Sequence, residues 1–504
     1  MTNAVRLALL VISLCVFCSE RPVSAQTPTR MGPASDEVIK KAFAAVQADI
    51  NSFKAHRSYI YAMGMKNPHL WEQYETWMKA YPDNVNIPIA IGKVYYMAAM
   101  PQPKDFLLKA AALAPDSASV WYMLAEDANM AARNDLFQEY IGKAATADPS
   151  NVNYAFGYLK SLEPGNRDHY ERMVFDFANR FRTDERGAQA LFGLGLQKTD
   201  LEKQRQLFEM LRELYPPEKF GATVLAMTHL TDIYLQTNPE KALLLAEEMG
   251  GEGDWKNRKQ AAETLIAVEN LERDQKYPEA LTKLEEVKLP RVNFTNDIIL
   301  LKKASLLENT GNVESAYDSL AARFAKLPTD AVFQALQFYG KKMGKEKDQV
   351  DQDIQLLRAK AATPAYPFEL GTYTTSDSLK MDALKGKVIL LTIWFPGCAP
   401  CREEFPHFQQ VVDIFKGDSL VYLGINALPS QDGFVLPFMK NTGYSFIPLR
   451  GSFAYTQQHF GVNGAPENFL IDKNGNIIFK NFRIDSSNHR TLELMISSLL
   501  EKGR

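Results

Sequence analysis

Cys398 and Cys401 are the residues of this chain whose type and spacing could most clearly do chemistry. The sequence has four cysteines, and the other two, Cys15 and Cys18, lie in an N-terminal segment with the pattern of a leader peptide. Loss of that leader would leave Cys398 and Cys401 with only each other to pair with. A Cys-x-x-Cys pair that opens a helix after a buried strand is typical of a thiolate and its resolving thiol. The pair therefore predicts dithiol–disulfide exchange. A purely structural disulfide is the alternative, but a loop of two residues would constrain little of the unfolded chain.

The elements that must position the two sulfurs are a strand before them and a helix that begins with them. Residues 388–395 are a continuous apolar, β-branched run, as expected of a central strand covered on both faces. A helix is expected over about 399–416. Further along we expect a strand at 420–426, a helix at 431–441, strands at 468–471 and 476–480, and a final helix at 487–502. This alternation predicts a compact α/β domain.

Four features, taken in order, make residues 366–504 resemble the thioredoxin superfamily, and more narrowly the exported TlpA/ResA-type thiol–disulfide oxidoreductases. They are a strand ending at Trp394, the segment Cys398-Ala399-Pro400-Cys401, Pro406 in the following helix, and Gly464-Ala465-Pro466 before a strand. The resemblance implies a thioredoxin-like fold that acts through its dithiol. We expect no cofactor, and no metal because the seven histidines show no ligand spacing; His407 and His459 are isolated in the sequence.

The resemblance also implies roles for the two cysteines. Cys398 would be the nucleophile, since free N–H groups and the positive end of the helix dipole stabilise a thiolate at a helix N-terminus. Cys401, one turn further in and more buried, would attack the mixed disulfide and release the reduced substrate.

Two further site residues come from the same resemblance. Pro466 matches the family's cis-proline, which lies opposite the cysteines and exposes backbone to an extended substrate; the alternative is an ordinary trans turn proline. Glu404 would accept the proton of Cys401, unless it is simply an exposed helix residue like Glu403. Many thioredoxins carry an acid six residues before the first cysteine instead, a position that Thr392 occupies here.

Two departures from the family pattern concern the substrate rather than the chemistry. Gly397 stands where a tryptophan is common, which predicts a barer surface beside the thiolate. Glu467 stands where a threonine is usual, and its charge could raise the pKa of the thiol or select a cationic substrate.

Residues 36–362 are expected to be helical throughout. Prolines recur there at one or two multiples of a period near 34–38 residues: Pro82, Pro115, Pro149, Pro216, Pro290 and Pro328. Such a period is typical of stacked helical hairpins, and the repeat that ends at Pro149 matches the tetratricopeptide pattern best. The sequence therefore predicts a tetratricopeptide-like, all-α solenoid followed by the α/β domain; an irregular helical bundle is the alternative. Residues 36–63 would form a capping helix, and the two prolines in 363–367 predict a linker.

The N-terminus predicts a signal peptide over residues 1–25 and a periplasmic location. Arg6, the apolar run 7–17 and the small residues Val23-Ser24-Ala25 form the expected pattern. A retained anchor, or a lipoprotein acylated at Cys18, fits less well. No later stretch is apolar enough to span a membrane, so we expect no integral span in the mature chain. The net charge of −3 does not suit a nucleic-acid-binding protein.

Together these features predict an exported disulfide reductase. Its substrate would be a protein disulfide, its electron donor an upstream thiol, and its helical repeats a platform for a protein partner. Reduction is favoured over oxidation because Ala-Pro between the cysteines resembles the Gly-Pro of strongly reducing relatives, and because Glu404 is anionic. The competing hypothesis is an envelope scaffold that binds a protein or polymer, with the thioredoxin fold as an accessory module. A peroxidase is disfavoured, since Cys398 lacks a Pro-x-x-x-Thr-x-x-Cys context.

Overall fold

The computed structural model describes residues 33–101, 104–163, 165–198, 200–287, 295–486 and 488–500. The predicted signal peptide and Pro290 lie outside these residues. The expected fold class is confirmed: a long run of helices precedes a mixed sheet with helices. Among the described residues, no helix combines the length and the apolar character that crossing a membrane requires.

Backbone contacts divide the chain into two compact units. The first contains the described residues up to Tyr170 together with Phe395–Arg402 and Leu428–Tyr444, and the second contains Glu171–Trp394, Glu403–Ala427 and the residues from Ser445 onward. The cysteine segment is thus grouped with the first helices, and the strands are grouped with the later ones.

In the first unit, helices that follow one another in the chain pack against each other, as α1 does with α2 and α6 with α7. They are α1 (Asp36–Ala48), α2 (Phe53–Met63), α3 (Pro68–Ala80), α4 (Asn86–Met97), α5 (Lys104–Leu113), α6 (Ala118–Met130), α7 (Asn134–Ala147) and α8 (Val152–Ser161). The prediction of one capping helix over 36–63 is wrong, because α1 ends before Asp49 and a second helix, α2, begins after Ser52. The Ser52 side chain accepts a hydrogen bond from the backbone N–H of Ala55 and so caps α2.

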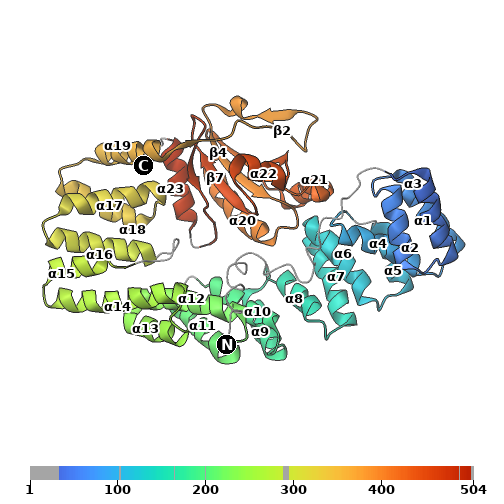
Figure 1. Cartoon of the computed structure of the whole chain (residues 1–504), viewed down its shortest axis with the longest axis horizontal. Helices are drawn as coiled ribbons and strands as arrows, with labels where there is room; N and C mark the ends of the chain where they lie inside the picture. The colour runs from blue at the N-terminus through green and yellow to red at the C-terminus, as the bar shows by residue number, and fades with distance from the viewer. Residues whose placement is uncertain are drawn as a thin grey trace. The chain divides into compact units, whose positions relative to one another are not determined.

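Helix α9 (Arg167–Arg180) crosses the division, and within the second unit the consecutive helices from α10 to α19 pack against each other (Figure 1). The helices are α10 (Glu185–Leu196), α11 (Leu201–Leu214), α12 (Gly221–Thr237), α13 (Pro239–Glu248), α14 (Asp254–Arg273), α15 (Tyr277–Leu284), α16 (Thr295–Asn309), α17 (Val313–Lys326), α18 (Asp330–Lys342) and α19 (Lys347–Ala361). The recurring prolines within the described residues all fall in turns between consecutive helices: Pro82, Pro115, Pro149, Pro216 and Pro328. Their period therefore reflects a helical hairpin repeat.

The strands after α19 form a mixed sheet in the order β1-β8-β7-β4-β5-β6. They are β1 (Thr363–Pro364), β4 (Val388–Trp394), β5 (Leu420–Asn426), β6 (Ile447–Arg450), β7 (Glu467–Ile471) and β8 (Asn476–Lys480), with β2 (Glu369–Gly371) and β3 (Ser378–Lys380) in a separate hairpin. The pairs β4–β5 and β5–β6 are parallel, and β4–β7, β7–β8 and β8–β1 are antiparallel.

Helices α20 (Ala399–Ile414), α21 (Asp432–Thr442), α22 (Phe453–Phe460) and α23 (His489–Leu500) alternate with these strands. The sequence prediction found β4, β5, β7, β8, α20, α21 and α23 and missed β6, α22 and the β2–β3 hairpin. Strand β6 is only four residues long and contains Pro448, so its hydrophobic pattern is too short to distinguish from a loop.

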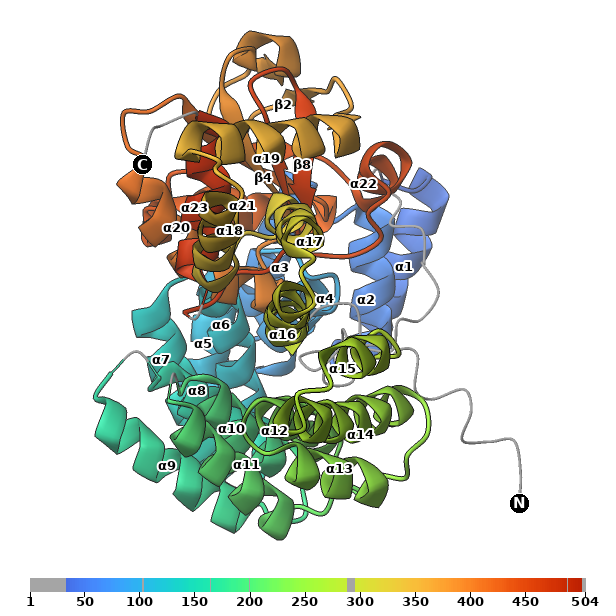
Figure 2. The same ribbon diagram turned by 90° about the vertical axis from the view of Figure 1, so that its left-hand side faces the viewer.

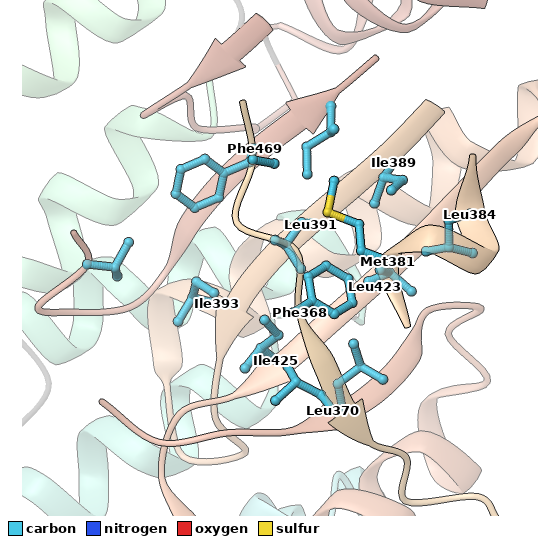
Figure 3. Packing of buried hydrophobic residues seen from close by; sticks show 14 of the residues in the cluster. Phe368, Leu370, Met381, Leu384, Ile389, Leu391, Ile393, Leu423, Ile425 and Phe469 are labelled. Carbon is cyan, nitrogen blue, oxygen red and sulfur yellow. The ribbon is translucent and has the colours of Figure 1, made fainter. Parts of the chain in front are cut away.

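Strand β4 is buried along its whole length and separates two apolar layers. On one face Ile389, Leu391 and Ile393 pack into a cluster with residues such as Phe368 and Phe469 (Figure 3). On the opposite face the Trp394 ring contacts the ring of Phe405 from α20 at 5.3 Å and that of Phe446 at 5.1 Å between centroids. This two-sided burial fixes β4 and, with it, the point at which the cysteine segment leaves the sheet.

The segment 363–367 is not the free linker that its prolines suggested. Thr363 and Pro364 pair with β8 as strand β1, and Ala365 donates a backbone hydrogen bond to Gly475. Proline has no N–H to give a ladder, but β1 is an edge strand, where that loss is tolerated. Just before it, α19 contacts β8, and Figure 2 labels the two elements beside each other.

Substituting Gly424 tests how tightly the Trp394 layer is packed. A Cβ at Gly424 would lie 2.7 Å from the Phe446 ring and 2.8 Å from Trp394 Nε1, closer than real Cβ contacts. We expect Gly424→Ala to destabilise its domain by about 1–3 kcal/mol, because the rings must move. Scanning calorimetry of the full chain would show one transition at lower temperature. Gly193→Ala is the control: a Cβ there meets nothing within 4 Å, so an equal loss in both variants would contradict the packing argument.

Candidate active site

Cys398 and Cys401 form a disulfide at the start of α20, with their Cα atoms 5.3 Å apart. The chain leaves β4 at Trp394 and turns at once, because the Cys398 N–H donates to the Phe395 carbonyl at 2.9 Å. Helix α20 starts at Ala399, so Cys398 occupies the position before its first residue. Cys398 is 3% exposed and Cys401 is fully buried. Both cysteines are therefore buried in the disulfide form.

The helix terminus directs a hydrogen-bond donor at the first sulfur. The backbone N–H of Cys401 donates to Cys398 Sγ at a distance of 3.3 Å between nitrogen and sulfur. In the reduced protein the same donor, with the positive end of the helix dipole, would stabilise a thiolate on Cys398. Pro400, in the first turn, lacks an N–H that the helix would not use.

The surface beside Gly397 is occupied, contrary to the expectation of a bare one. The Gly397 N–H donates to Gln431 Oε1 at 2.7 Å. A Cβ at Gly397 would lie 2.9 Å from Gln431 Nε2, so a larger side chain would have to displace this amide. Gln431, which no sequence pattern singled out, therefore fills the place next to the cysteine segment.

Glu404 lies one turn after Cys401 on α20, and its side chain is only 6% exposed, unlike the exposed Glu403. The interpretation as a solvated helix residue is therefore wrong. Asn468 Nδ2 donates to Glu404 Oε2 at 3.0 Å. The backbone N–H of Ile484 and Nη1 of Arg483 approach Oε1 at 3.4 and 3.5 Å.

Burial raises the pKa of Glu404 to about 7. The hydrogen bond from Asn468, the charge of Arg483 and the N–H of Ile484 act in the opposite direction, since they favour the carboxylate. A carboxyl group with this pKa changes its protonation near neutral pH, where proton transfer from a thiol is most effective.

Thr392 and Asn468 complete the surroundings of Glu404. They lie directly opposite each other on β4 and β7, and both are fully buried. The Thr392 hydroxyl donates to Asn468 Oδ1 at 2.9 Å. The sequence drew attention to Thr392 only as a missing acid, and Asn468 was not considered; its place two residues after Pro466 was the one available signal.

Pro466 is buried, and the peptide bond that joins it to Ala465 is cis. Glu467, the first residue of β7, pairs with Ile393, so the register brings Pro466 beside the end of β4, where the cysteine segment departs. Glu467 is half-buried, and that burial raises the pKa of its carboxyl group, while the charge of Arg483 lowers it. A second carboxyl group thus stands next to the cis bond.

Arg402 follows Cys401 directly, and its guanidinium contacts residues from other parts of the chain. Its Nη1 donates to the Asn129 carbonyl at 2.6 Å, and its guanidinium lies 5.7 Å from the centre of the Phe438 ring. Burial lowers the pKa of Arg402, and the charge of Glu126 opposes that shift.

The histidines differ partly from expectation. His407 is isolated in sequence but not in space, because His489 Nε2 and His407 Nδ1 lie 2.8 Å apart. His459 stacks on Tyr366 with ring centres 3.8 Å apart. Within the described ranges, no three His, Cys, Asp or Glu side chains are grouped so that they could hold a metal ion.

Sequence comparisons find relatives of the part of the chain that carries the cysteine pair. The Redoxin family model matches residues 359–493. The thiol-disulfide oxidoreductase ResA of Bacillus subtilis (strain 168) is 28% identical over 105 residues, which cover 21% of this chain and 58% of the relative. The sporulation thiol-disulfide oxidoreductase A of the same strain is 27% identical over 95 residues, 18% of this chain and 58% of the relative. The chain thus spans less than two thirds of the length of these relatives.

Solved structures with a similar domain include a thiol:disulfide interchange protein of the thioredoxin family from Chlorobium tepidum TLS. It is 24% identical and covers 28% of this chain and 97% of its own, with a TM-score of 0.25. StoA from Bacillus subtilis is 23% identical and covers 26% and 98%, with a TM-score of 0.23. The family match and the sequence relatives lead to one conclusion: residues 359–493 form a Redoxin domain, thioredoxin-like in fold and homologous to thiol–disulfide oxidoreductases of the ResA type.

Proposed function

We propose that this protein is an exported, periplasmic thiol–disulfide oxidoreductase that reduces protein disulfides with the Cys398–Cys401 dithiol. The observation that carries the proposal is the position of the pair: Cys398 precedes the first residue of α20, and the Cys401 N–H donates to its sulfur. A thiolate formed there is stabilised by the helix terminus and has a second sulfur within reach.

The reaction proceeds by two exchanges. The Cys398 thiolate attacks one sulfur of the substrate disulfide, forms a mixed disulfide and releases the other substrate sulfur as a thiolate, which takes up a proton. Glu404 then accepts the proton of Cys401, whose thiolate attacks Cys398 Sγ and releases the second substrate sulfur as a thiolate, which takes up the proton that Glu404 holds. The substrate gains two electrons and two protons, and the protein is left with the Cys398–Cys401 disulfide. An upstream dithiol restores the reduced form.

Pro466 and Glu467 would bind the substrate during these steps. The backbone around the cis bond lies at the end of β7, beside the strand that leads to the cysteines. An extended substrate segment could pair with that backbone. The carboxyl group of Glu467 would favour segments that carry a positive charge.

The helices α1 to α19 would serve as a tetratricopeptide-like platform for a protein partner. Helical repeats present extended surfaces that suit such binding. The N-terminal sequence supports export, with lipoprotein anchoring as the less favoured variant of the same location. The size of the array also supports the second candidate, an envelope scaffold that binds a protein or polymer and uses the Redoxin domain as an accessory.

Replacing each cysteine separates these two candidates. We expect the full-length reduced protein to reduce insulin, and we expect Cys398→Ser to abolish this activity because no attacking sulfur remains. Cys401→Ser should still form a mixed disulfide but fail to release it, which gel electrophoresis without reductant would detect. Negligible and equal activity of the unmodified protein and Cys398→Ser would favour the scaffold.

The redox potential tests the reducing direction. We expect a value near roughly −270 mV, the region of thioredoxin, because Ala-Pro separates the cysteines and no cation is hydrogen-bonded to either sulfur among the described contacts. Equilibration with glutathione buffers would measure it. A potential more positive than about −180 mV would assign the protein to the isomerases and oxidants.

The pH dependence of stability tests the burial of Glu404. Its pKa is about 7 in the folded oxidised protein and about 4.3 in an unfolded chain. Because the folded value is higher, Glu404 stabilises the fold below pH ~4, and that contribution is lost as the pH rises through 7. Relative to Glu404→Gln, the unmodified protein should lose about 3 kcal/mol of unfolding free energy between pH 4 and 8.

The matched control for that measurement is Glu403→Gln, which removes the exposed neighbouring carboxyl group. Denaturant unfolding at each pH should separate Glu404→Gln from the unmodified protein far more than it separates Glu403→Gln, because an exposed carboxyl group loses less hydration on folding. If Glu404→Gln instead runs parallel to the unmodified protein, then Glu404 does not titrate with the raised pKa and its role as proton acceptor near neutral pH is wrong.

A further inference from the structure

The buried carboxylate of Glu404 is held from across the sheet by a pair of side chains that face each other on neighbouring strands. Thr392 on β4 lies opposite Asn468 on β7 in the antiparallel register. Side chains opposite each other in such a pair stand on the same face of the sheet. That face also carries Trp394, which packs against Phe405 of α20, the residue that follows Glu404. The register therefore brings both polar side chains under the helix that carries Glu404.

The Phe482 carbonyl, which can only accept a hydrogen bond, fixes which way the Asn468 amide points. The amide oxygen then faces Thr392, whose hydroxyl donates to Asn468 Oδ1 at 2.9 Å, and Nδ2 points the other way. There Nδ2 donates to Glu404 Oε2 at 3.0 Å and to the Phe482 carbonyl at 2.9 Å. A flipped amide would set its oxygen against a carboxylate and a carbonyl. All three side chains are at least 94% buried, so water offers little compensation for such a loss.

Each of these hydrogen bonds to Glu404 is donated to the carboxylate. Asn468 donates to Oε2, and the N–H of Ile484 and Nη1 of Arg483 donate to Oε1. Donors favour the ionised form, which is the form able to accept a proton, whereas burial favours the neutral form. Asn468 gives the shortest of these bonds, at 3.0 Å, and its side chain is fully buried, whereas that of Arg483 is half exposed.

Charged groups around Glu404 come from several elements. Arg483, in the segment after β8, is 3.5 Å from its carboxylate, and Glu467 at the start of β7 also interacts with that arginine. One turn further along α20, His407 is hydrogen-bonded to His489 from α23. Asp485 interacts electrostatically with His407. The Asn468 amide is neutral, so its removal changes a hydrogen bond to Glu404 and leaves this set of charges as it was.

We propose that Thr392 and Asn468 are a pair of positioning residues that orient the Glu404 carboxylate and keep it able to take the proton of Cys401. This inference rests on the proposed function and deepens it. Thr392 occupies the strand position where many thioredoxins carry an acid, and Glu404 is the acid that this chain carries on the helix instead. Asn468 connects the two through its hydrogen bonds.

The two phases of a reaction with the aromatic disulfide DTNB test the proposal. With the reduced full-length protein, the first thionitrobenzoate released reports the attack by Cys398, and the second reports the resolution by Cys401. We expect Asn468→Leu, which keeps the volume but removes the amide, to move the pH midpoint of the second phase upward by about one unit. Below that midpoint resolution would be about tenfold slower, a modest effect for a hydrogen bond to a charge. The first phase should keep its rate.

Thr392→Val is the second variant, because valine has the same shape as threonine and the substitution removes only the hydrogen bond to the Asn468 amide. Thr392→Val should also move the pH midpoint of the second phase upward, but by a smaller amount than Asn468→Leu. This second variant keeps the proposal testable if Asn468→Leu does not fold. Asn426→Leu is the matched control: Asn426 is a fully buried asparagine on β5 that donates to the Tyr373 hydroxyl instead. It should leave the midpoint of the second phase unchanged.

A double variant separates the failure of this inference from the failure of the proposed function. In a Glu404→Gln background, Asn468→Leu should cause no further shift of the midpoint. Unshifted profiles in Asn468→Leu and Thr392→Val, or shifts that persist without Glu404, would overturn the role of the pair. An unchanged profile in Glu404→Gln alone would instead overturn the role of Glu404 as proton acceptor, while the insulin assay still tests the dithiol.

Discussion

The antiparallel register of β4 and β7 is the constraint on which the rest of the site depends. Ile389, Leu391 and Ile393 must face one apolar layer, and a slip by one residue would turn them to the other face. The same register sets Thr392 against Asn468 and Pro466 beside the end of β4. Core packing, which is specified by many side chains, therefore also specifies the few polar contacts of the site.

Within that frame, the site balances burial against hydrogen bonding at a single carboxyl group. Burial alone would keep Glu404 protonated, and donors alone would keep it ionised. Their opposition leaves the pKa of Glu404 about 7, which neither influence would give separately. Phe405, the residue after Glu404, packs against Trp394, and the carboxylate of Glu404 itself is paired with the half-exposed Arg483. In the proposed mechanism, the helix that would stabilise a thiolate at its first turn thus also carries the proton acceptor one turn further on.

Much of the fold could be predicted from the sequence because its signals are local. The apolar run of β4, the Cys-x-x-Cys spacing and the proline before β7 each lie within a few residues. Strand β6 and helix α22 were missed because short elements carry too little pattern. Asn468 was missed for another reason: it meets Thr392 across 76 positions and Glu404 across 64, so its role exists only once the sheet has formed. The contact between Gln431 and Gly397 spans 34 positions and was hidden in the same way.

The prolines of residues 363–367 predicted a boundary between the helical array and the α/β domain. The structure shows that the chain at this boundary is paired with the sheet. Helix α19 leads straight into β1, which pairs with β8 at the edge of the sheet. The Arg358 guanidinium lies 5.0 Å from the centre of the Phe479 ring on β8, and its Nε donates to the Ala325 carbonyl on α17. A fragment that began at residue 366 would lose β1 and this cover over Phe479. Since a sheet edge stripped of its neighbour offers unpaired backbone groups to other chains, the Redoxin domain depends on the end of the helical array for a properly closed edge.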